Sequence, residues 1–184
     1  MAKVIAGMTV SLDGFIADEH GDSGMLYADF EQLVGSPWLT EAQEVTGAAL
    51  MGRRTFDGAD DPDGYADGYE FQVPIVVLTH RPPDRAPRRN ERLFFTFVTE
   101  GVAAAVACAA ELAGDRAVTV IGGADLNQQL LAAGLVDELW IDVMPVLLGR
   151  GRRLFDGAPP QELEKLRVDD LGMRTSLRFR VPRG

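Results

Sequence analysis

Two adjacent glycines, Gly122 and Gly123, stand where the chain changes from a strand pattern to a helix pattern. Residues 118–121 form a β-branched apolar run of the kind found in buried strands. From Ala124 onward leucines recur at helical spacing, and Gly134 marks the end of this pattern. A helix that begins directly after a glycine turn presents free backbone N–H groups and the positive end of its dipole, which together bind phosphate. The pattern predicts a phosphate site, with an ordinary tight turn as the alternative.

Two further segments with phosphate-binding groups follow strand-like runs. Gly52-Arg53-Arg54-Thr55 comes after the apolar residues 48–51, and Thr79-His80-Arg81 comes after residues 74–78. Guanidinium groups bind phosphate through paired, charge-assisted hydrogen bonds. Because ligands of parallel sheets bind at the carboxyl ends of the strands, the three segments together predict a site for a dinucleotide that carries an additional phosphate.

The elements that must position these segments alternate between strand and helix. Strands are expected at residues 3–11, 48–52, 74–78, 93–98, 118–121 and 138–146, and an alanine-rich helix at 101–112. Residues 163–171 and 175–181 alternate well enough to form an antiparallel pair around Gly172, whereas 147–153 is typical of a glycine- and arginine-containing turn. This order predicts an α/β fold with helices on both faces of a mixed, mostly parallel sheet and an antiparallel C-terminal edge. Residues 1–184 are expected to form a single domain.

Composition and charge argue against several classes of protein. The formal net charge of −10 argues against a nucleic-acid partner. No apolar run approaches the roughly 20 residues that span a bilayer, and the N-terminal residues do not resemble a secretion signal. The single cysteine, Cys108, cannot form an internal disulfide, and His20 and His80 are isolated. We therefore expect a cytoplasmic protein with no metal site and no membrane association.

Residues 57–68 form an acidic segment that contains several glycines. Calcium loops of the EF-hand type have a similar composition, but the glutamate that such loops require is missing. We expect an exposed acidic loop here, and we expect the arginines at 85–92 to lie on a solvated surface.

Five segments, taken in order, resemble the dihydrofolate reductase superfamily, and most of all its branch with the reductase domain of bacterial riboflavin-pathway enzymes. They are SLDGFIA (11–17), MGRRTFD (51–57), PIVVLTHRP (74–82), VIGGADLNQQLL (120–131) and GLVDELWIDVMPVLLGRGRRLF (134–155). The resemblance covers nearly the whole chain and implies the three-layer αβα fold of dihydrofolate reductase. It also implies a homodimeric, NADPH-dependent reductase that transfers a hydride to a small nitrogen heterocycle. The heterocycle would be pteridine- or dihydrofolate-like, or the aminopyrimidine of 5-amino-6-(5-phosphoribosylamino)uracil reductase activity.

The resemblance further implies which positions contact NADPH. In the family, the segments after two strands hold the pyrophosphate and the 2′-phosphate. The glycine turn wraps the pyrophosphate and nicotinamide side, and the backbone after the first strand meets the nicotinamide carboxamide. In this chain those positions are Ile16, Ala17, Gly52, Arg53, Arg54, Thr55, Leu78, Thr79, His80, Arg81, Ile121, Gly122, Gly123, Ala124, Asp125 and Leu126.

The family's substrate-binding carboxylate falls near Asp29, which implies a catalytic role for Asp29 in orienting or protonating the heterocycle. Asp29 followed by Gln32 is also typical of a helix N-cap, and both interpretations stay open. Glu31 is a nearby alternative acid. Asp13, in contrast, is typical of an ordinary turn.

Some positions depart from the family pattern. Gly7 stands where riboflavin-pathway reductases usually have a lysine that helps to hold the ribose phosphate. We also expect the zinc deaminase domain of the bifunctional enzymes to be absent. Met25-Leu26 replaces the proline-tryptophan pair of dihydrofolate reductases. We therefore expect a stand-alone member whose substrate differs from both familiar ones, with a non-catalytic NADPH-binding or sensor protein as the alternative. The apolar strand at 139–146 indicates either a dimer surface or a buried central strand.

Overall fold

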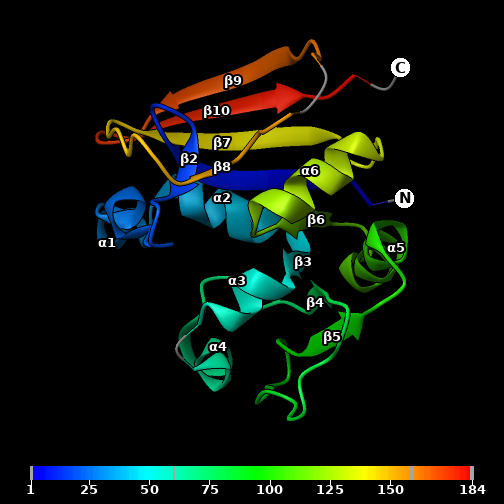
Figure 1. Cartoon of the computed structure of the whole chain (residues 1–184). Coiled ribbons are helices and arrows are strands. Elements are labelled where there is room, and N and C mark those ends of the chain that lie inside the picture. The colour runs from blue at the N-terminus through cyan, green and yellow to red at the C-terminus, as the bar shows by residue number, and fades with distance from the viewer. Residues whose placement is uncertain (1, 60, 158–159, 183–184) are drawn as a thin grey trace.

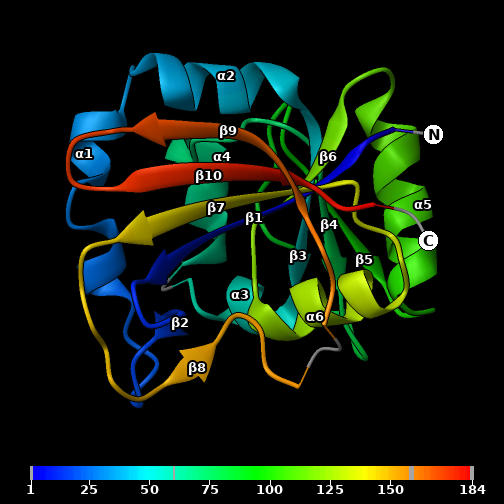
Figure 2. The ribbon, with the colours of Figure 1, turned by 90° about the horizontal axis from the view of Figure 1, so that it is seen from above.

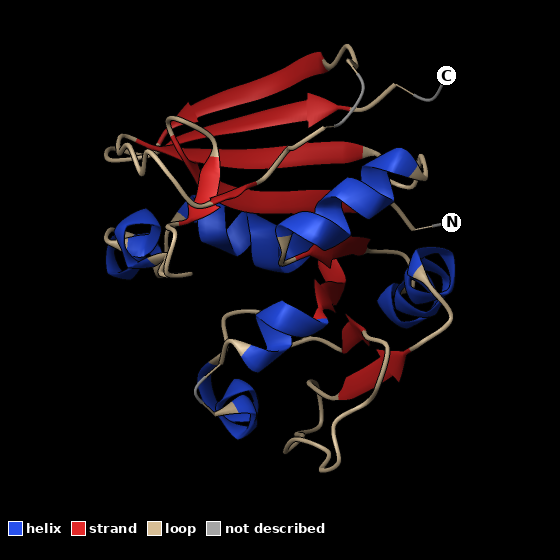
Figure 3. Cartoon of the chain, viewed as in Figure 1, coloured by secondary structure: helices blue, strands red, loops and turns tan. Residues whose placement is uncertain are grey.

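One twisted sheet forms the centre of the computed structural model, which describes residues 2–59, 61–157 and 160–182. In these residues eight strands lie in the order β5-β4-β3-β6-β1-β7-β10-β9. Figure 1 labels most of these strands, and Figure 3 colours the strands red. The strands from β5 to β7 run parallel, and β10 and β9 are each antiparallel to the preceding neighbour. In sheet order they are β5 (Phe95–Val98), β4 (Ile75–Leu78), β3 (Thr46–Gly52), β6 (Ala117–Val120), β1 (Val4–Ser11), β7 (Glu138–Met144), β10 (Thr175–Arg180) and β9 (Glu164–Asp170).

Helices cover both faces of this sheet. The longer helices α5 (Val102–Ala113) and α6 (Ala124–Ala132) pack on one face. The other face carries α1 (Phe30–Leu33), α2 (Pro37–Val45), α3 (Arg53–Asp57) and α4 (Tyr65–Gly68), together with the short turns η1 (Gly24–Tyr27) and η2 (Pro62–Gly64). Figure 2 shows α2 and α6 on opposite sides of the strands. The predicted three-layer arrangement with an antiparallel C-terminal edge is confirmed.

Strand alternation divides the buried residues into two cores. In β3, Ala48 and Leu50 face α5 and α6, whereas Ala49 and Met51 face a second cluster that contains Phe56 of α3. Both sets are fully buried because β3 lies between β4 and β6 and has helices on both faces. Because the strands from β5 to β7 in sheet order run parallel, their carboxyl ends lie at one common edge of the sheet.

The face that carries α2 becomes polar toward β1, β7 and β10. Thr9, Asp142 and Ser176 are buried there, while Leu139 and Ile141 point into the opposite, apolar core. Trp38 of α2 covers this polar face and donates a hydrogen bond from Nε1 to Oγ of Ser176 over 3.2 Å. Buried polar groups of this kind are stable only when their hydrogen bonds are satisfied.

The pairing of the strands decides two predictions made from the sequence, one for the apolar strand at 139–146 and one for the turn at 147–153. Strand β7 pairs with β1 on one side and with β10 on the other, so it is the buried central strand of the two alternatives. The expected turn at 147–153 is wrong at its end, because β8 (Arg152–Arg153) pairs with β2 (Phe15–Ala17). Gly151 is packed so closely against the backbone carbonyl of Ala17 that a Cβ atom could not fit.

The acidic segment and the later arginines bind each other. Asp63 accepts hydrogen bonds from the backbone N–H of Arg88 (2.7 Å) and from the Arg85 side chain, and Arg88 also pairs with Asp67. The prediction of a solvated arginine surface is confirmed, because Arg85 and Arg88 are exposed, and both side chains also pair with the acidic segment. The expectation of a loop at 57–68 is wrong for its second half, because η2 and α4 occupy residues 62–68. Asp60 lies outside the described residues.

Asp13 is a turn residue, and it also fixes a distant loop. Its carboxylate accepts hydrogen bonds from Ser11 Oγ (2.6 Å), Leu148 N (3.1 Å) and Gly149 N (2.7 Å). These bonds, above all the one from Ser11, lower the pKa of Asp13 to about 2. The loop after β7 is thereby tied to the turn after β1.

In the part of the chain that the structure describes, no helix is both long enough and apolar enough to cross a membrane.

Candidate functional site

A cleft of about 520 Å³ crosses the carboxyl ends of β3, β4, β5 and β6. We call it the strand-end cleft. Three predicted phosphate-binding segments come together in it, although they are far apart in sequence. The predicted cofactor residues that line it are Gly52, Arg53, Arg54, Thr55, Leu78, Thr79, His80, Arg81, Gly123, Ala124, Asp125 and Leu126.

The glycine turn packs tightly against α3. Gly122 has φ 135°, and a Cβ atom at this position would lie 2.8 Å from Oγ1 of Thr55. Gly122 also accepts a hydrogen bond from the Gly52 backbone N–H through its carbonyl oxygen, over 2.9 Å. A side chain at Gly122 would need both a rarely populated backbone conformation and the space that Thr55 occupies. The turn therefore needs glycine, and it brings the start of α6 beside the start of α3.

The positive charge of the cleft comes from arginines that are only partly neutralised. Arg53 donates to Asp57 Oδ1 (2.7 Å) and to the backbone carbonyl of Arg81, which ties the end of β3 to the end of β4. Arg54 pairs with Asp125 over 3.1 Å, and both of these side chains are exposed. Neither α3 nor α6 has a side-chain N-cap, so the backbone N–H groups of their first turns have no side-chain acceptor at the cap. Backbone donors and guanidinium groups in this arrangement can bind a phosphorylated ligand.

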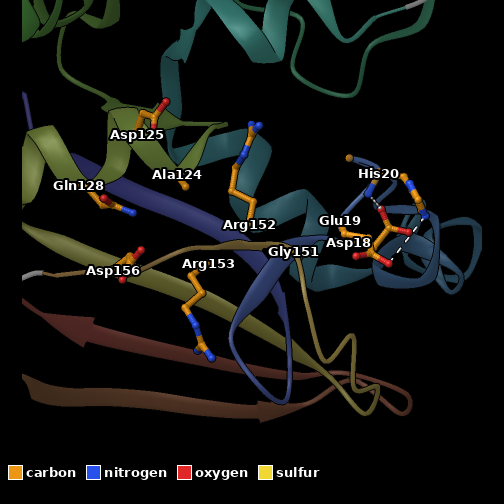
Figure 4. Close-up of a pocket in the computed structure, with 11 residues that line it drawn as sticks. Asp18, Glu19, His20, Ala124, Asp125, Gln128, Gly151, Arg152, Arg153 and Asp156 are labelled. Carbon is orange, nitrogen blue, oxygen red and sulfur yellow. Dashed lines mark hydrogen bonds and ion pairs between the residues drawn. The ribbon is translucent and has the colours of Figure 1, made fainter.

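A second cavity, of about 660 Å³, adjoins the strand-end cleft and shares Ala124, Asp125 and Arg152 with it. We call it the side cavity. In Figure 4 the side chains of Arg152 and Arg153 extend from β8 in opposite directions. The Arg153 side chain makes contacts within the protein: its Nη1 donates a hydrogen bond to the Asp13 carbonyl (3.2 Å), and its guanidinium lies 4.4 Å from the Phe15 ring centre. Arg152 forms no side-chain hydrogen bond or ion pair with any residue that the structure describes, so its charge is available to a ligand.

The remaining predicted cofactor residues lie outside the lining of the strand-end cleft. Ile16 and Ala17 form β2 and pair with β8, and the Ile16 side chain packs against the apolar core. Gly122 lies behind Thr55, and Ile121 lines a different cavity.

This other cavity, of about 260 Å³, lies on the polar face of the sheet, under α2. We call it the aromatic cavity. Its aromatic lining residues are Tyr27, Phe30, Trp38, Tyr69, Phe71 and Trp140. Because Ile121 lines the aromatic cavity and Gly123 lines the strand-end cleft, the two sites lie on either side of the glycine turn.

Asp29 is buried and bound to Arg174. Its carboxylate is 2% exposed, and it accepts two hydrogen bonds from Arg174, one from Nε (2.9 Å) and one from Nη2. These bonds hold the pKa of Asp29 below its usual value. Asp29 occupies the N-cap position of α1, but its side chain makes no capping hydrogen bond. The capping interpretation is therefore wrong, because the carboxylate turns toward Arg174 instead.

Two further acids meet at the aromatic cavity. Asp142 is buried and lies 3.3 Å from Nη1 of Arg174, and its burial raises its pKa above the usual value for an aspartate. Burial likewise raises the pKa of Glu70. Carboxyl groups with raised pKa values can hold a proton nearer neutral pH, as acid–base chemistry requires.

Sequence reasoning missed Arg152, Glu70, Asp142 and Arg174. Asp142 had a signal, since it is an acid between apolar residues in a strand with two buried faces. Arg174 follows Gly172 by two residues in a hairpin, where an arginine is normally exposed. The neighbouring residues in the sequence therefore did not indicate that Arg174 is buried. Among the described residues no group of three or more histidines, cysteines, aspartates and glutamates could hold a metal ion.

Comparison with known proteins gives a family match over nearly the whole chain. The family model of the RibD C-terminal domain matches residues 2–177. The uncharacterized protein YwjB of Bacillus subtilis is 28% identical over 153 residues, which cover 83% of this chain and 82% of YwjB.

Solved structures share the fold at low sequence identity. RibD of Acinetobacter baumannii has a TM-score of 0.71 at 22% identity, with 100% of this chain and 59% of RibD covered. Dihydrofolate reductase of Enterococcus faecalis, complexed with NADP(H), has a TM-score of 0.62 at 15% identity, with 98% and 97% covered. At these identities the likeness establishes the dihydrofolate-reductase-like fold.

Proposed function

This chain belongs to the RibD C-terminal domain family, and from that premise we propose that it is an NADPH-dependent reductase of a small nitrogen heterocycle. The observation that carries the proposal is the meeting of three phosphate-binding segments in the strand-end cleft, beside the aromatic cavity. Large phosphorylated cofactors bind across such strand ends, and planar substrates bind in neighbouring apolar cavities.

The residues of the cleft fit NADPH. We assign Arg53 and Arg81 to the 2′-phosphate, because both lie where β3 and β4 end and both keep donors free beyond their protein contacts. We assign the pyrophosphate to the α6 start at Gly123, Ala124 and Asp125, where the cleft has backbone donors and no side-chain cap. Arg152, which faces both the cleft and the side cavity, would add a second cation there. The contact of Ile16 and Ala17 with the nicotinamide carboxamide stays a prediction.

When bound, NADPH would supply a hydride from its nicotinamide to the carbon of a C=N bond, while the nitrogen takes one proton and NADP⁺ is released. The chain's own residues hold the ring and deliver the proton. Asp142 lines the aromatic cavity, and burial raises its pKa, so we propose that it holds this proton. Asp29 is paired with Arg174 behind the cavity wall, so we propose that Asp29 is a positioning residue that acts through Arg174.

A titration of the protein with NADPH and, separately, with NADH tests the proposal. We expect NADPH to bind at least about tenfold more tightly, because one charge-assisted contact to the 2′-phosphate contributes roughly 1.5–3 kcal/mol and 1.4 kcal/mol is a factor of ten. Binding is followed through nucleotide fluorescence. Equal affinities would contradict the assignment of the arginines, and no binding of either nucleotide would contradict the reductase proposal.

Substitution of Gly122 by alanine should weaken NADPH binding about tenfold and lower stability by about 1–3 kcal/mol. The new methyl group requires a strained backbone conformation and displaces Thr55 from the turn. Nucleotide titration and thermal unfolding measure the two effects. Gly134→Ala is the matched control, since Gly134 also has a positive φ, of 65°, but no atom within 4 Å of its Cβ position. If both variants bind NADPH equally well, the turn does not shape the cofactor site.

A non-catalytic NADPH-binding or sensor protein is the second candidate, favoured by the engagement of Asp29 in its ion pair. It predicts NADPH binding without NADPH oxidation in the presence of any heterocycle.

A cytoplasmic location and a homodimer also stay proposals. For the dimer, β9 at the sheet edge leaves Leu166 and Val168 37% and 51% exposed.

A further inference from the structure

The walls of the aromatic cavity combine flat rings with acids. The two tryptophans of the chain, Trp38 and Trp140, both contribute to it, from α2 and β7. Glu70 and Asp142 are the acids among its described lining residues, and Arg174 is the one cation. A volume of about 260 Å³ lies below the roughly 300–1,000 Å³ of sites for drug-sized ligands, so the cavity accommodates a small ring system.

Arg174 has no donor left for a ligand. A guanidinium group has five N–H donors. Those of Arg174 go twice to Asp29, and once each to the Leu26 carbonyl (3.2 Å), Thr9 Oγ1 (3.2 Å) and Asp142 Oδ2 (3.3 Å). The Asp29 carboxylate balances its charge, Asp142 lies within ion-pair distance, and the Arg174 side chain is 1% exposed. Arg174 is therefore part of the cavity wall and cannot serve as a phosphate ligand.

The acids, in contrast, retain acceptor capacity. No other described residue donates a side-chain hydrogen bond to the Glu70 carboxyl group. Asp142 hydrogen bonds with Arg174 and with the Ser176 hydroxyl, and one of its oxygens, Oδ1, lies outside the ion pair with Arg174. Thr9 and Ser176 add hydroxyl oxygens to the same cavity. Acceptors of this kind bind ring N–H and amino groups, and carboxylates favour a ring that carries a positive charge.

The arginines that are exposed or only partly neutralised lie on the far side of the glycine turn. Arg53, Arg54, Arg81 and Arg152 line the strand-end cleft, and none of them lines the aromatic cavity. A phosphate dianion in the aromatic cavity would lose its hydration beside two acids and gain no free cation in return.

We propose that the aromatic cavity binds a small planar heterocycle that is rich in N–H donors or positively charged and that carries no phosphate group. This inference rests on the proposed function, which it deepens by naming the substrate class. It sets this chain apart from a reductase of a phosphoribosylated aminopyrimidine. The ring stacks on the aromatic side chains, and its donors face Glu70 and Asp142.

Two matched pairs of probes test the inference. The first pair is 2,4-diaminopteridine and lumazine, which share the pteridine rings but have amino groups or carbonyl groups at the same positions. The second pair is 6-hydroxymethylpterin and its phosphate monoester. Binding to the full chain is measured by calorimetry and by quenching of Trp38 and Trp140, with and without saturating NADP⁺.

We expect the diamino compound to bind at least about tenfold more tightly than lumazine, and the alcohol at least about tenfold more tightly than its phosphate ester. Glu70→Gln and Asp142→Asn should each reduce both preferences, while Glu111→Gln, an exposed position on α5, should change neither. Glu70→Gln leaves the Arg174 ion pairs intact, so it tests the inference even if Asp142→Asn folds poorly.

Equal binding within either pair, tighter binding of the phosphate ester, or no binding of any probe would overturn the inference. Failure of the proposed function is a separate observation, because it is the absence of NADPH binding to the strand-end cleft. The tryptophan signal reports the aromatic cavity whether or not that cofactor binds.

Discussion

Replacement of Arg174 by methionine is expected to lower the free energy of unfolding by about 3–5 kcal/mol at pH 7. Methionine can fill the space of the side chain, but it leaves Asp29 and Asp142 buried without their cation. For a chain of this length 1 kcal/mol shifts Tm by roughly 2–4 °C, so the melting temperature should fall by roughly 6–20 °C. Chemical denaturation and calorimetry measure both quantities.

The loss of stability caused by Arg174→Met should also depend on pH. As the pH falls, the wild type should lose the stability that Asp29 contributes, whereas the destabilisation caused by the substitution should become smaller. In the wild type the pKa of Asp29 is lowered by Arg174, so this contribution to stability is present above the pKa of the unfolded chain and is lost as the pH falls through the folded pKa. In the variant the buried acids lack a cation, so their pKa values should rise. The destabilisation should then shrink between pH 7 and pH 5, because a protonated acid is easier to bury.

The matched control is Arg180→Ala, which removes the exposed ion pair of Arg180 with Glu164. Exposed pairs contribute about 0–1 kcal/mol, so its Tm should change little. A second variant, Arg174→Met combined with Asp29→Asn, should recover part of the lost stability. If Arg174→Met proves no more harmful than Arg180→Ala, the buried ion pair is not what stabilises this face of the sheet.

Simultaneous replacement of Arg53 and Arg81 by alanine should weaken NADPH binding about 100-fold or more and leave NADH binding nearly unchanged. Each guanidinium group is assigned to the 2′-phosphate, where a charge-assisted contact contributes roughly 1.5–3 kcal/mol, and 1.4 kcal/mol is a factor of ten. Parallel titrations with NADPH and NADH give the ratio of the two dissociation constants. Because NADH lacks the 2′-phosphate, the ratio isolates that contact from general damage to the cleft.

Two controls accompany this variant. Arg116→Ala removes an exposed arginine that precedes β6, at the opposite end of the sheet from the cleft, and should not change the ratio. Thermal unfolding shows whether loss of the bond from Arg53 to the Arg81 carbonyl has loosened the strand ends. An equal loss of affinity for both nucleotides would contradict the assignment to the 2′-phosphate.

Local pattern was sufficient for most of the fold. Strand and helix periodicities, together with glycine at turns, identified β1, β3, β4, β6, α5 and α6 because side-chain direction in these elements repeats every few residues. The same patterns placed the three predicted phosphate-binding segments at strand ends. Since the ends of parallel strands meet at one edge, their gathering in the strand-end cleft followed from the sequence.

Pairings between distant segments were not encoded locally. β2 and β8 form a ribbon between residues 15–17 and 152–153, and this pairing, which no sequence periodicity indicates, brings Arg152 to the strand-end cleft. Asp29 likewise fitted both a catalytic acid and a helix cap, because the types and spacing of its neighbours are compatible with either.

The sequence by itself determined the layers, the mostly parallel sheet and the glycine- and arginine-bearing strand ends, since these depend on short-range spacing. Only the tertiary structure decided that Arg174 leaves its hairpin and binds Asp29, 145 positions away in the chain, next to Asp142. An arginine in a turn has the same local sequence whether it is exposed or buried. Its burial depends on which acids the order of strands brings beside it, and that order joins β1, β7 and β10 across the whole chain.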